Sequence, residues 1–268
     1  MGDAGAVRHP DRRTEPDPHR GFTFYGARVV PLKVRARLAE LSSRFALPDG
    51  AAERLATLLA LVAAEPVSIT AVRDPAEGVD VHVADSLVAV ELEVVRRAES
   101  IADLGSGSGF PGLALAIALP RARVALVESV QRKCVFLERA AAALGLVNVG
   151  VVCARVEAWS AGLGVHDLVT ARALGALGVL VEYSAPLLRA DGALVAWKGR
   201  RDAAEEADAI AAAEALGMSL PRAVAVEPFA GARDRHLYLS SKVGPTPPGY
   251  PRRPGMARKR PLRASTGR

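Results

Sequence analysis

Cysteine and aromatic residues are scarce in this chain of 268 residues. The two cysteines, Cys134 and Cys153, fall in an expected helix and an expected strand and lack the CxxC spacing of zinc sites. We therefore expect neither a disulfide framework nor a metal site, and we interpret both as small core residues. With two Trp, four Tyr and six Phe, the chain is also poorly suited to an aromatic platform that stacks single-stranded bases.

Long apolar runs are missing as well. No stretch reaches the ~18 uninterrupted apolar residues that a membrane span needs, and the charged, proline-bearing N-terminus does not resemble a secretory signal. We expect a cytoplasmic protein that has no membrane partner and no obligate protein partner. Half of the residues are apolar, so the chain is able to bury a sizeable core.

The positive charge of the chain is concentrated at its C-terminal end. Residues 244–268 contain seven Arg and Lys residues and no Asp or Glu, and subtracting these seven charges from the net +6 leaves the rest of the chain at −1. The segment is also rich in proline, so we predict a disordered basic tail. Such arms often contact phosphate backbones, and the alternative is a solvated end without a partner.

Ahead of residue 100 the sequence indicates helices. Residues 1–21 lack periodicity and are predicted to be disordered, whereas residues 22–99 are predicted to form a helical N-terminal region. Helices are expected from Pro31, over 51–64 and from about Asp85, because apolar residues recur there at helical spacing. Residues 65–82, which contain two prolines and a glycine, are expected to be mostly loop.

From residue 100 to 243 the pattern is typical of a parallel sheet with crossover helices. Seven strands are predicted, near 100–104, 123–128, 149–154, 166–171, 192–198, 223–228 and 236–242. Helices are predicted in the first five gaps, at about 110–119, 130–144, 156–161, 176–189 and 201–216. Only a short link around AGARD separates the last two strands, so these are expected to pair as an antiparallel hairpin.

A glycine-rich stretch, DLGSGSGFPG at 103–112, follows the first predicted strand directly. Glycine permits positive φ and close approach, so we expect a ligand to lie against the turn that contains Gly105, Gly107 and Gly109. The same letters contain the dinucleotide pattern GxGxxG. Glu128 also closes the second strand, where a dinucleotide fold carries its ribose acid, so these features alone leave NAD and S-adenosylmethionine both open.

Two further features favour S-adenosylmethionine. Asp103 precedes the turn, where a carboxylate can face the positive ammonium of the methionine part, a group that NAD lacks. An antiparallel last strand after alternating strands and helices resembles the class I methyltransferases. The predicted fold is therefore α/β, of the class I Rossmann-like methyltransferase type, with a seven-stranded, mostly parallel sheet whose last strand is antiparallel.

Six short motifs make the resemblance more specific, and they occur in the order HVADS (82–86), DLGSGSGFPG (103–112), VESVQRKCVFL (127–137), ARVE (154–157), TARA (170–173) and WKG (197–199). With these motifs the chain resembles the glucose-inhibited division protein B family, the guanine-N7 methyltransferases of bacterial small-subunit ribosomal RNA. The resemblance implies S-adenosylmethionine as methyl donor and no metal. It also implies 16S ribosomal RNA or a small-subunit precursor particle as partner, methylated at N7 of one guanine in the decoding-region loop.

The resemblance also implies cofactor contacts at Gly105, Phe110, Val156, Glu157 and Arg172. From residue type alone we add Asp103 for the methionine amine, Glu128 for the ribose hydroxyls, and Gly107 and Gly109 for the shape of the turn.

Candidate substrate contacts are Arg172, Lys198, Arg132 and His82, since arginine can hydrogen-bond the edge of guanine. The N7 of guanine carries a free lone pair, so direct displacement of the methyl group requires alignment and no general base. No residue is assigned as a catalytic base or nucleophile, because the five histidines are scattered and no triad spacing occurs. Three alternatives remain: a methyltransferase for a small molecule or protein, an NAD-dependent dehydrogenase, and a noncatalytic RNA-binding protein.

Overall fold

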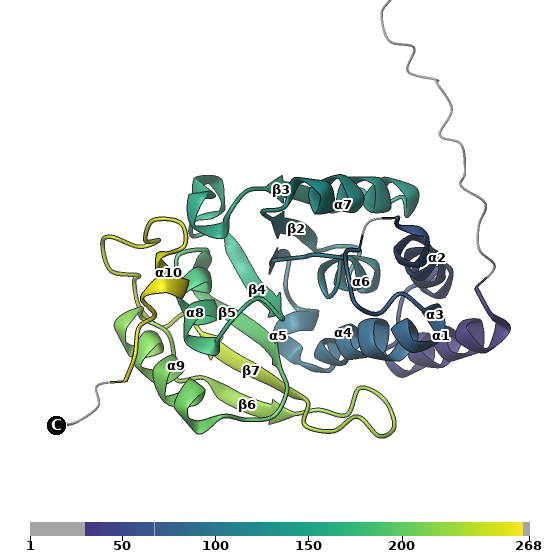
Figure 1. Ribbon diagram of the computed structural model, residues 1–268. Helices are drawn as coiled ribbons and strands as arrows, with labels where there is room; N and C mark the ends of the chain where they lie inside the picture. Colours follow the sequence, from purple (N-terminus) through teal and green to yellow (C-terminus); the bar gives the residue numbers. More distant parts are fainter. Residues whose placement is uncertain (1–29, 67, 265–268) are drawn as a thin grey trace, which may run out of the picture.

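The computed structural model describes residues 30–66 and 68–264 (Figure 1). The segment for which the sequence predicts N-terminal disorder, 1–21, lies outside these residues. The helices predicted from Pro31 and over 51–64 are confirmed as α1 (Leu32–Arg44) and α2 (Ala51–Ala64). Val34, Leu38 and Leu41, four and three residues apart, form the buried face of α1.

The loop predicted over 65–82 is wrong from Pro75 onward. A helical stretch begins there, ten residues before the expected start at Asp85, because Asp74 caps it by accepting a hydrogen bond from the Ala76 amide at 3.0 Å. It continues with changing pitch as α3 (Pro75–Gly78), the π-helical η1 (Val79–Ala84), α4 (Asp85–Leu87), the 3-10 helix η2 (Val88–Glu91) and α5 (Glu93–Arg96).

All seven predicted strands are present in one sheet. They are β1 (Ser100–Leu104), β2 (Arg123–Glu128), β3 (Val149–Cys153), β4 (His166–Arg172), β5 (Leu188–Lys198), β6 (Arg222–Ala225) and β7 (His236–Ser241). Their order is β3-β2-β1-β4-β5-β7-β6. The first five pair in parallel, and β7 runs antiparallel to β5 and β6, so the expected hairpin is confirmed.

Helices cover both faces of the sheet (Figure 1). The crossovers contain α6 (Gly112–Ala118), α7 (Gln131–Ala143), two 3-10 turns, η3 (Val156–Ala158) and η4 (Ser160–Gly162), then α8 (Leu177–Ser184) and α9 (Ala203–Ala215). Successive β1 side chains enter opposite cores: Ile101 packs in the cluster of the N-terminal helices, α6 and α7, and Ala102 in that of α8 and α9. Within residues 30–66 and 68–264, none of the helices has the length and hydropathy to span a bilayer.

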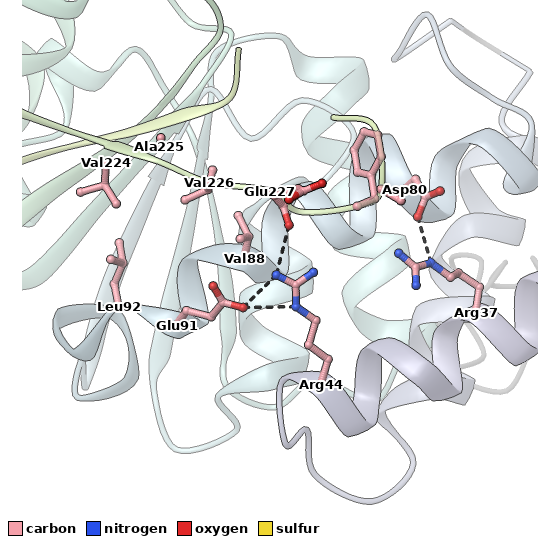
Figure 2. A pocket seen from close by; sticks show the side chains of 12 residues that line it. Arg37, Arg44, Asp80, Val88, Glu91, Leu92, Val224, Ala225, Val226 and Glu227 are labelled. Atoms are coloured by element: carbon pink, nitrogen blue, oxygen red, sulfur yellow. Dashed lines mark hydrogen bonds and ion pairs between the residues drawn. The ribbon is translucent and has the colours of Figure 1, made fainter. Parts of the chain in front are cut away.

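The N-terminal helices are joined to the far edge of the sheet by Arg44 (Figure 2). Its guanidinium donates to the carbonyl oxygens of Pro228 at 2.9 Å and Glu227 at 3.1 Å, and it pairs with Glu91 at 2.9 Å. These contacts connect the end of α1 with the segment that follows β6. The helical region and the sheet therefore pack as one body.

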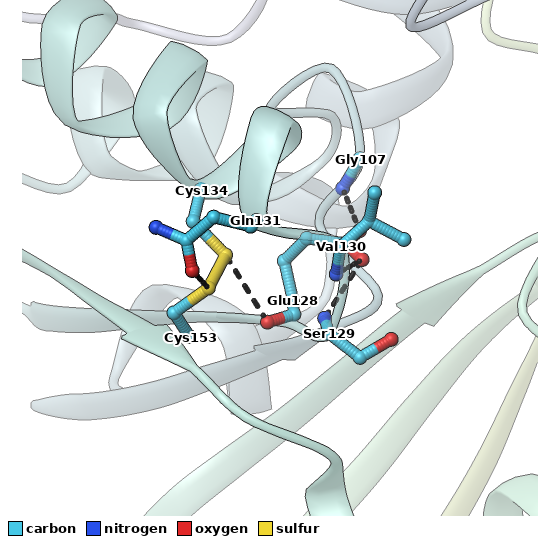
Figure 3. Close-up of a disulfide and its surroundings, with 7 residues drawn as sticks. All are labelled: Gly107, Glu128, Ser129, Val130, Gln131, Cys134 and Cys153. Carbon is cyan, nitrogen blue, oxygen red and sulfur yellow. Dashed lines mark hydrogen bonds between the residues drawn. A yellow bond between two sulfur atoms is a disulfide. The ribbon is translucent and has the colours of Figure 1, made fainter.

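The interpretation of the cysteines as two separate core residues is wrong. Cys134, in the first turn of α7, and Cys153, at the end of β3, form a disulfide with their Cα atoms 5.7 Å apart (Figure 3). Cys134 is buried and Cys153 is exposed. Parallel pairing places Glu128 opposite Cys153, and α7 starts soon after β2, so the two sulfurs meet although the cysteines are 19 positions apart in sequence.

The prediction of a disordered tail is wrong for residues 244–264, which we call the C-terminal strap. The strap lies on the body and contains the short helix α10 (Met256–Lys259). It is held by the ion pair of Arg252 with the buried Glu182, and Ala257 packs into the core on the α8 side. Composition indicated disorder because proline and arginine bury little apolar surface, but specific polar contacts order the strap instead.

Candidate functional site

The glycine turn between β1 and α6 leaves its backbone bare toward an open cavity. Gly105, Gly107 and Gly109 have φ of +67°, +56° and +92°, a region that other residues rarely adopt. The amides of Gly105 and Ser106 donate to the Val127 carbonyl oxygen at 2.8 and 3.2 Å, which fastens the turn to β2. A Cβ at Gly107 would meet only the Gly105 carbonyl oxygen, at 3.6 Å, so the space above this residue is free for a ligand.

Asp103 lies beneath this turn and is fully buried. Its carboxylate accepts hydrogen bonds from the Thr170 hydroxyl at 2.8 Å and from the Gly112 amide at 3.2 Å. Burial raises the pKa of Asp103, while these hydrogen bonds act in the opposite direction. The side chain therefore fastens β1 to β4 and to the start of α6, and its contact with a methionine amine stays a prediction.

Glu128 supports the other side of the turn (Figure 3). One carboxylate oxygen accepts from the amides of Ser129 at 2.7 Å and Val130 at 2.8 Å, and the other accepts from the Gly107 amide at 3.1 Å. The acid at the end of β2 thus holds the loop in the shape that exposes Gly107. Its expected contact with ribose hydroxyls remains a prediction.

The cavity has a volume of about 570 Å³ and opens at the carboxyl ends of β1, β4 and β5. In open α/β sheets this is the edge where ligands bind, at the point where the strand order reverses between β1 and β4. The glycine turn forms one wall, the ends of β4 and β5 form a second, and residues 69–72 with η1 form a third.

A larger hollow of about 860 Å³ lies between α1 and β6 (Figure 2). Its lining includes Arg37, Arg44 and Asp80, and none of the glycine turn. The hydrogen bonds of Arg44 cross it. We therefore place the functional site in the smaller cavity, which combines the bare backbone with the polar groups described next.

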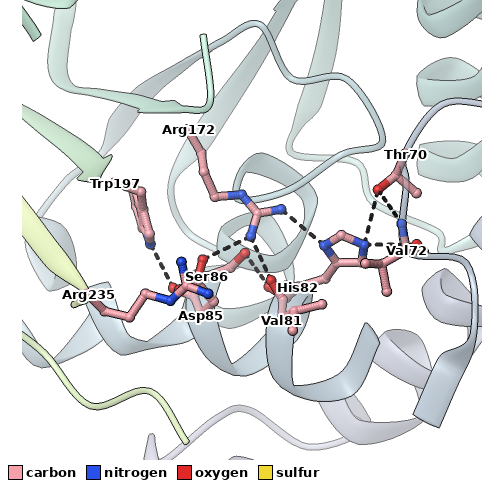
Figure 4. Close-up of polar contacts among 9 residues, drawn as sticks. All are labelled: Thr70, Val72, Val81, His82, Asp85, Ser86, Arg172, Trp197 and Arg235. Carbon is pink, nitrogen blue, oxygen red and sulfur yellow. Dashed lines mark hydrogen bonds and ion pairs between the residues drawn. The ribbon is translucent and has the colours of Figure 1, made fainter. Parts of the chain in front are cut away.

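Arg172, at the end of β4, organises the polar wall of the cavity (Figure 4). It donates to the Val81 carbonyl oxygen at 3.1 Å, to the Asp85 carboxylate at 3.0 Å and to Nδ1 of His82 at 3.3 Å. A guanidinium only donates, so Nδ1 of His82 accepts and the imidazole proton sits on Nε2, which donates to the Val72 carbonyl oxygen at 3.0 Å. His82 is therefore neutral, and burial also lowers its pKa.

An aromatic ring and a second hydrogen bond complete this network. Phe110 stacks on His82 with ring centroids 4.9 Å apart, and the Arg172 guanidinium lies 5.8 Å from the Phe110 ring centroid. The Asp85 carbonyl oxygen accepts from Nε1 of Trp197 at 2.6 Å. Strands β4 and β5 are thereby joined to the helical stretch that carries HVADS.

Cations dominate the lining of the cavity. Lys133, Arg172, Lys198 and Arg235 line it, and among the described lining residues Asp85 is the only carboxylate. Lys198 is partly neutralised by Glu205, which it contacts at 2.5 Å from outside the lining. This distribution favours an anionic or electron-rich ligand.

The structure gathers only some of the predicted site residues around the cavity. Six line it: His82, Gly105, Gly107, Phe110, Arg172 and Lys198. Six others do not: Asp103, Gly109, Glu128, Arg132, Val156 and Glu157. Val156 packs against the core on the α8 side, Glu157 accepts from the Gly255 amide at 2.7 Å, and Arg132 is exposed on α7. Their assigned roles are therefore predictions that the cavity geometry does not test.

Lys133, Trp197 and Arg235 are among the lining residues that sequence reasoning did not assign to the site. Lys133 and Trp197 lie in the motifs VESVQRKCVFL and WKG. Their neighbours Arg132 and Lys198 were predicted site residues, so the sequence indicated the correct segments. Arg235 had no sequence signal, because it stands beside the last strand and reaches the site only through the β6–β7 hairpin. Among the described residues, no three His, Cys, Asp or Glu side chains gather as metal ligands would.

Similarity to known proteins identifies the family of this chain. Residues 51–238 match the family model described as rRNA small subunit methyltransferase G. Two relatives carry the name "Ribosomal RNA small subunit methyltransferase G". The one from Rubrobacter xylanophilus is 42% identical over 202 residues, which are 73% of this chain and 77% of the relative. The one from Lacticaseibacillus paracasei is 41% identical over 190 residues, 68% and 77% of the two chains.

Among solved structures, the S-adenosylmethionine-dependent methyltransferase SibL in its apo form aligns with a TM-score of 0.53. The alignment covers 80% of this chain and 70% of SibL at 15% identity. At that identity the likeness concerns the fold alone, and it confirms the predicted class I methyltransferase architecture.

Proposed function

Because the chain belongs to the rRNA small subunit methyltransferase G (GidB) family, we propose that it transfers a methyl group from S-adenosylmethionine to N7 of one guanine in 16S ribosomal RNA. Methylation of small-subunit ribosomal RNA with this donor follows from the family. The guanine, its N7 and the decoding-region loop are the finer part of the proposal. The observation that carries it is a cavity at the switch point of the sheet, bounded by the bare glycine turn and by four cations.

The turn fits the methyl donor. The open space above Gly107 is what a ligand lying flat against the backbone requires. Gly105, Gly107, Phe110 and Arg172 would hold the cofactor from the cavity side, with Glu128 keeping the turn in shape. When bound, S-adenosylmethionine supplies a methyl group that its sulfonium already activates.

The chain's own residues then have to align the acceptor nitrogen, since N7 needs no deprotonation. His82 does not act as a base, because Arg172 occupies its Nδ1 and Nε2 holds a proton donated to Val72. Its ring and that of Phe110 instead form a flat wall. Arg172, Lys198 and Arg235 can bind the phosphate or the O6 edge of guanine while N7 stays free.

The site also has to stabilise the charge of the methylated product. Methylation at N7 leaves a positive charge on the base, and Asp85 places its carboxylate at the cavity wall. We propose that Asp85 offsets this charge as well as positioning Arg172. The substrate is naked 16S RNA or an assembling small-subunit particle, which supports a cytoplasmic location.

Modification mapping tests the proposal. Mass spectrometry of small-subunit RNA from a strain that lacks the gene is expected to miss one 7-methylguanosine, which the wild-type gene restores. A gene encoding Arg172→Ala should not restore it, whereas one encoding Arg97→Ala should, because Arg97 is an exposed partner of Glu93 outside the cavity. An unchanged set of 7-methylguanosines in the deletion strain would contradict the proposal.

Calorimetry separates the alternatives. S-adenosylhomocysteine is expected to bind and NAD is not, which would exclude a dehydrogenase. A methyltransferase for small molecules or proteins would label those substrates and never RNA. A noncatalytic RNA-binding protein would bind RNA and leave it unmethylated.

A further inference from the structure

The C-terminal strap, residues 244–264, is fixed to the body along its whole length. The Thr246 hydroxyl donates to the Ala185 carbonyl oxygen at 3.0 Å, and Arg252 donates to both carboxylate oxygens of Glu182 at 2.7 and 2.5 Å. Near its end, the Ala264 amide donates to the Asp208 carboxylate at 3.1 Å. The strap crosses α8 and reaches α9, so its backbone is held in one place before any partner arrives.

The strap lies at the edge of the sheet that carries the functional site. The Gly255 amide donates to Glu157 in the turn after β3, and Arg258 donates to the Leu174 carbonyl oxygen at 2.6 Å in the turn after β4. Leu174 contacts the glycine turn, since a Cβ on Gly105 would lie 2.6 Å from its Cδ1. Its neighbour Ala173 lines the cavity. One loop, 173–175, therefore separates the strap from the site.

The exposed charges of the strap are all positive. Its exposed charged residues are Arg253, Arg258, Lys259, Arg260 and Arg263, and the segment has no Asp or Glu. None of these five forms an ion pair with a described residue, whereas the strap's remaining arginine, Arg252, is neutralised by Glu182. In the cavity, by contrast, Arg172 and Lys198 each have a carboxylate partner. Lys133, which also lines the cavity, forms no ion pair with a described residue, and the strap adds five such uncompensated cations at this edge.

We propose that the C-terminal strap is a preformed ledge that binds the phosphate backbone of the RNA beside the target guanine. The inference rests on the proposed function and adds a contact surface to it. Lys and Arg side chains bind phosphates without reading bases, so the ledge contributes affinity and register but no sequence preference. Its only aromatic residue, Tyr250, lies against Arg252 with 5.8 Å between guanidinium and ring, so the contact is electrostatic rather than stacking.

Fixing the strap in advance matters for affinity. A disordered basic arm loses conformational entropy when it binds, while an arm already held by Glu182 and Glu157 has lost most of it on folding. The ledge therefore binds more tightly than a free tail of the same charge.

The salt dependence of RNA binding tests the ledge. The variant R253Q/K259Q/R260Q/R263Q removes four exposed charges and keeps Arg252 and Arg258, which hold the strap. The probe is the small-subunit RNA of the deletion strain, titrated by fluorescence anisotropy between 50 and 200 mM salt. Each lost phosphate contact should reduce the slope of log K against log salt by about 0.7 and the affinity at 0.1 M salt by about fivefold. The KM for RNA should rise, with kcat and S-adenosylhomocysteine affinity unchanged.

A matched control carries the same change in charge elsewhere. The variant R35Q/R54Q/R96Q/R121Q alters four exposed arginines outside the strap and the cavity. Its salt slope should stay close to that of the wild type. Equal losses in both variants, or an unchanged slope in the strap variant, would overturn the ledge while leaving RNA methylation intact. Wild-type protein that neither binds nor methylates RNA would instead defeat the proposed function.

Glu182→Gln separates a fixed ledge from charge alone. The substitution keeps every cation of the strap and removes the carboxylate that holds Arg252. Weaker RNA binding, with faster proteolysis of residues 244–264 and unchanged S-adenosylhomocysteine affinity, supports the ledge. RNA binding as tight as in the wild type, despite a strap that proteolysis shows to be loosened, would overturn it.

Discussion

A single methyl group added at Gly107 tests whether a ligand lies against the glycine turn. Gly107 has φ of +56°, and an added Cβ would meet no protein atom closer than 3.6 Å. In the absence of ligand, Gly107→Ala therefore introduces backbone strain and no collision. Gly145→Ala is the matched control, because Gly145 has φ of +63° and nothing within 4 Å of an added Cβ.

The two substitutions should have the same effect on stability. An alanine in the left-handed region costs about 1–2 kcal/mol, which lowers the Tm of a chain of this size by about 2–8 °C. The entropy that alanine removes from the unfolded chain is equal at both positions and cancels in the comparison. Any difference between the variants in ligand binding then reports the contact itself.

The two variants should differ in their affinity for the ligand. A methyl group forced into a packed contact costs about 1–3 kcal/mol, so Gly107→Ala should bind S-adenosylhomocysteine roughly 5- to 150-fold more weakly, and Gly145→Ala should bind it like the wild type. Isothermal titration measures the affinities. In thermal unfolding, ligand at about 100 Kd should stabilise the wild type and Gly145→Ala by about 2.7 kcal/mol and Gly107→Ala by much less. Wild-type affinity in Gly107→Ala would refute the placement of the cofactor on this turn.

Three other perturbations have defined outcomes. Asp85→Asn removes the carboxylate that holds Arg172, so the free energy of unfolding should fall by about 2 kcal/mol in denaturant titrations, and methylation should fall more than S-adenosylhomocysteine binding. Burial lowers the pKa of His166 to about 4, so the unfolded chain binds the extra proton between pH 6.5 and 4. Stability should be fully present above pH 6.5 and decrease below it by up to about 1.4 kcal/mol per pH unit, and His166→Gln should flatten that slope. Reduction of the Cys134–Cys153 disulfide should lower stability by about 3 kcal/mol, and unfolding of Cys153→Ser should not respond to reductant.

The sheet and its connections were predictable from local sequence. Short apolar runs alternate with helical stretches between residues 100 and 243, and this alternation predicts a parallel sheet with crossover helices. The link between the last two strands is too short for a crossover helix and contains the turn-forming AGARD, so the antiparallel last strand was predictable too. The glycine turn was found because its residue type reports a backbone requirement directly.

Three features could not be predicted from local sequence. The helical stretch from Pro75 begins after its capping residue, Asp74. The segment around it contains proline and glycine, and this composition predicted a loop. The disulfide joins residues whose neighbourhood exists only after β2 and β3 have paired. The strap has the composition of a disordered tail, and its order depends on Glu182, a buried carboxylate 70 residues before Arg252.

The sequence by itself determined the order of strands and helices, the site of the bare turn and the family to which the chain belongs, since each depends on residues adjacent along the chain. Only the tertiary structure decided which side chains meet. The tertiary structure buries Asp103 and Glu128, whose carboxylates hold the glycine turn, and it sets the tautomer of His82 through Arg172. It also brings Arg235 to the cavity and fastens the strap beside the cavity. These outcomes depend on contacts between distant segments, whose hydrogen bonds exist only once the sheet has formed.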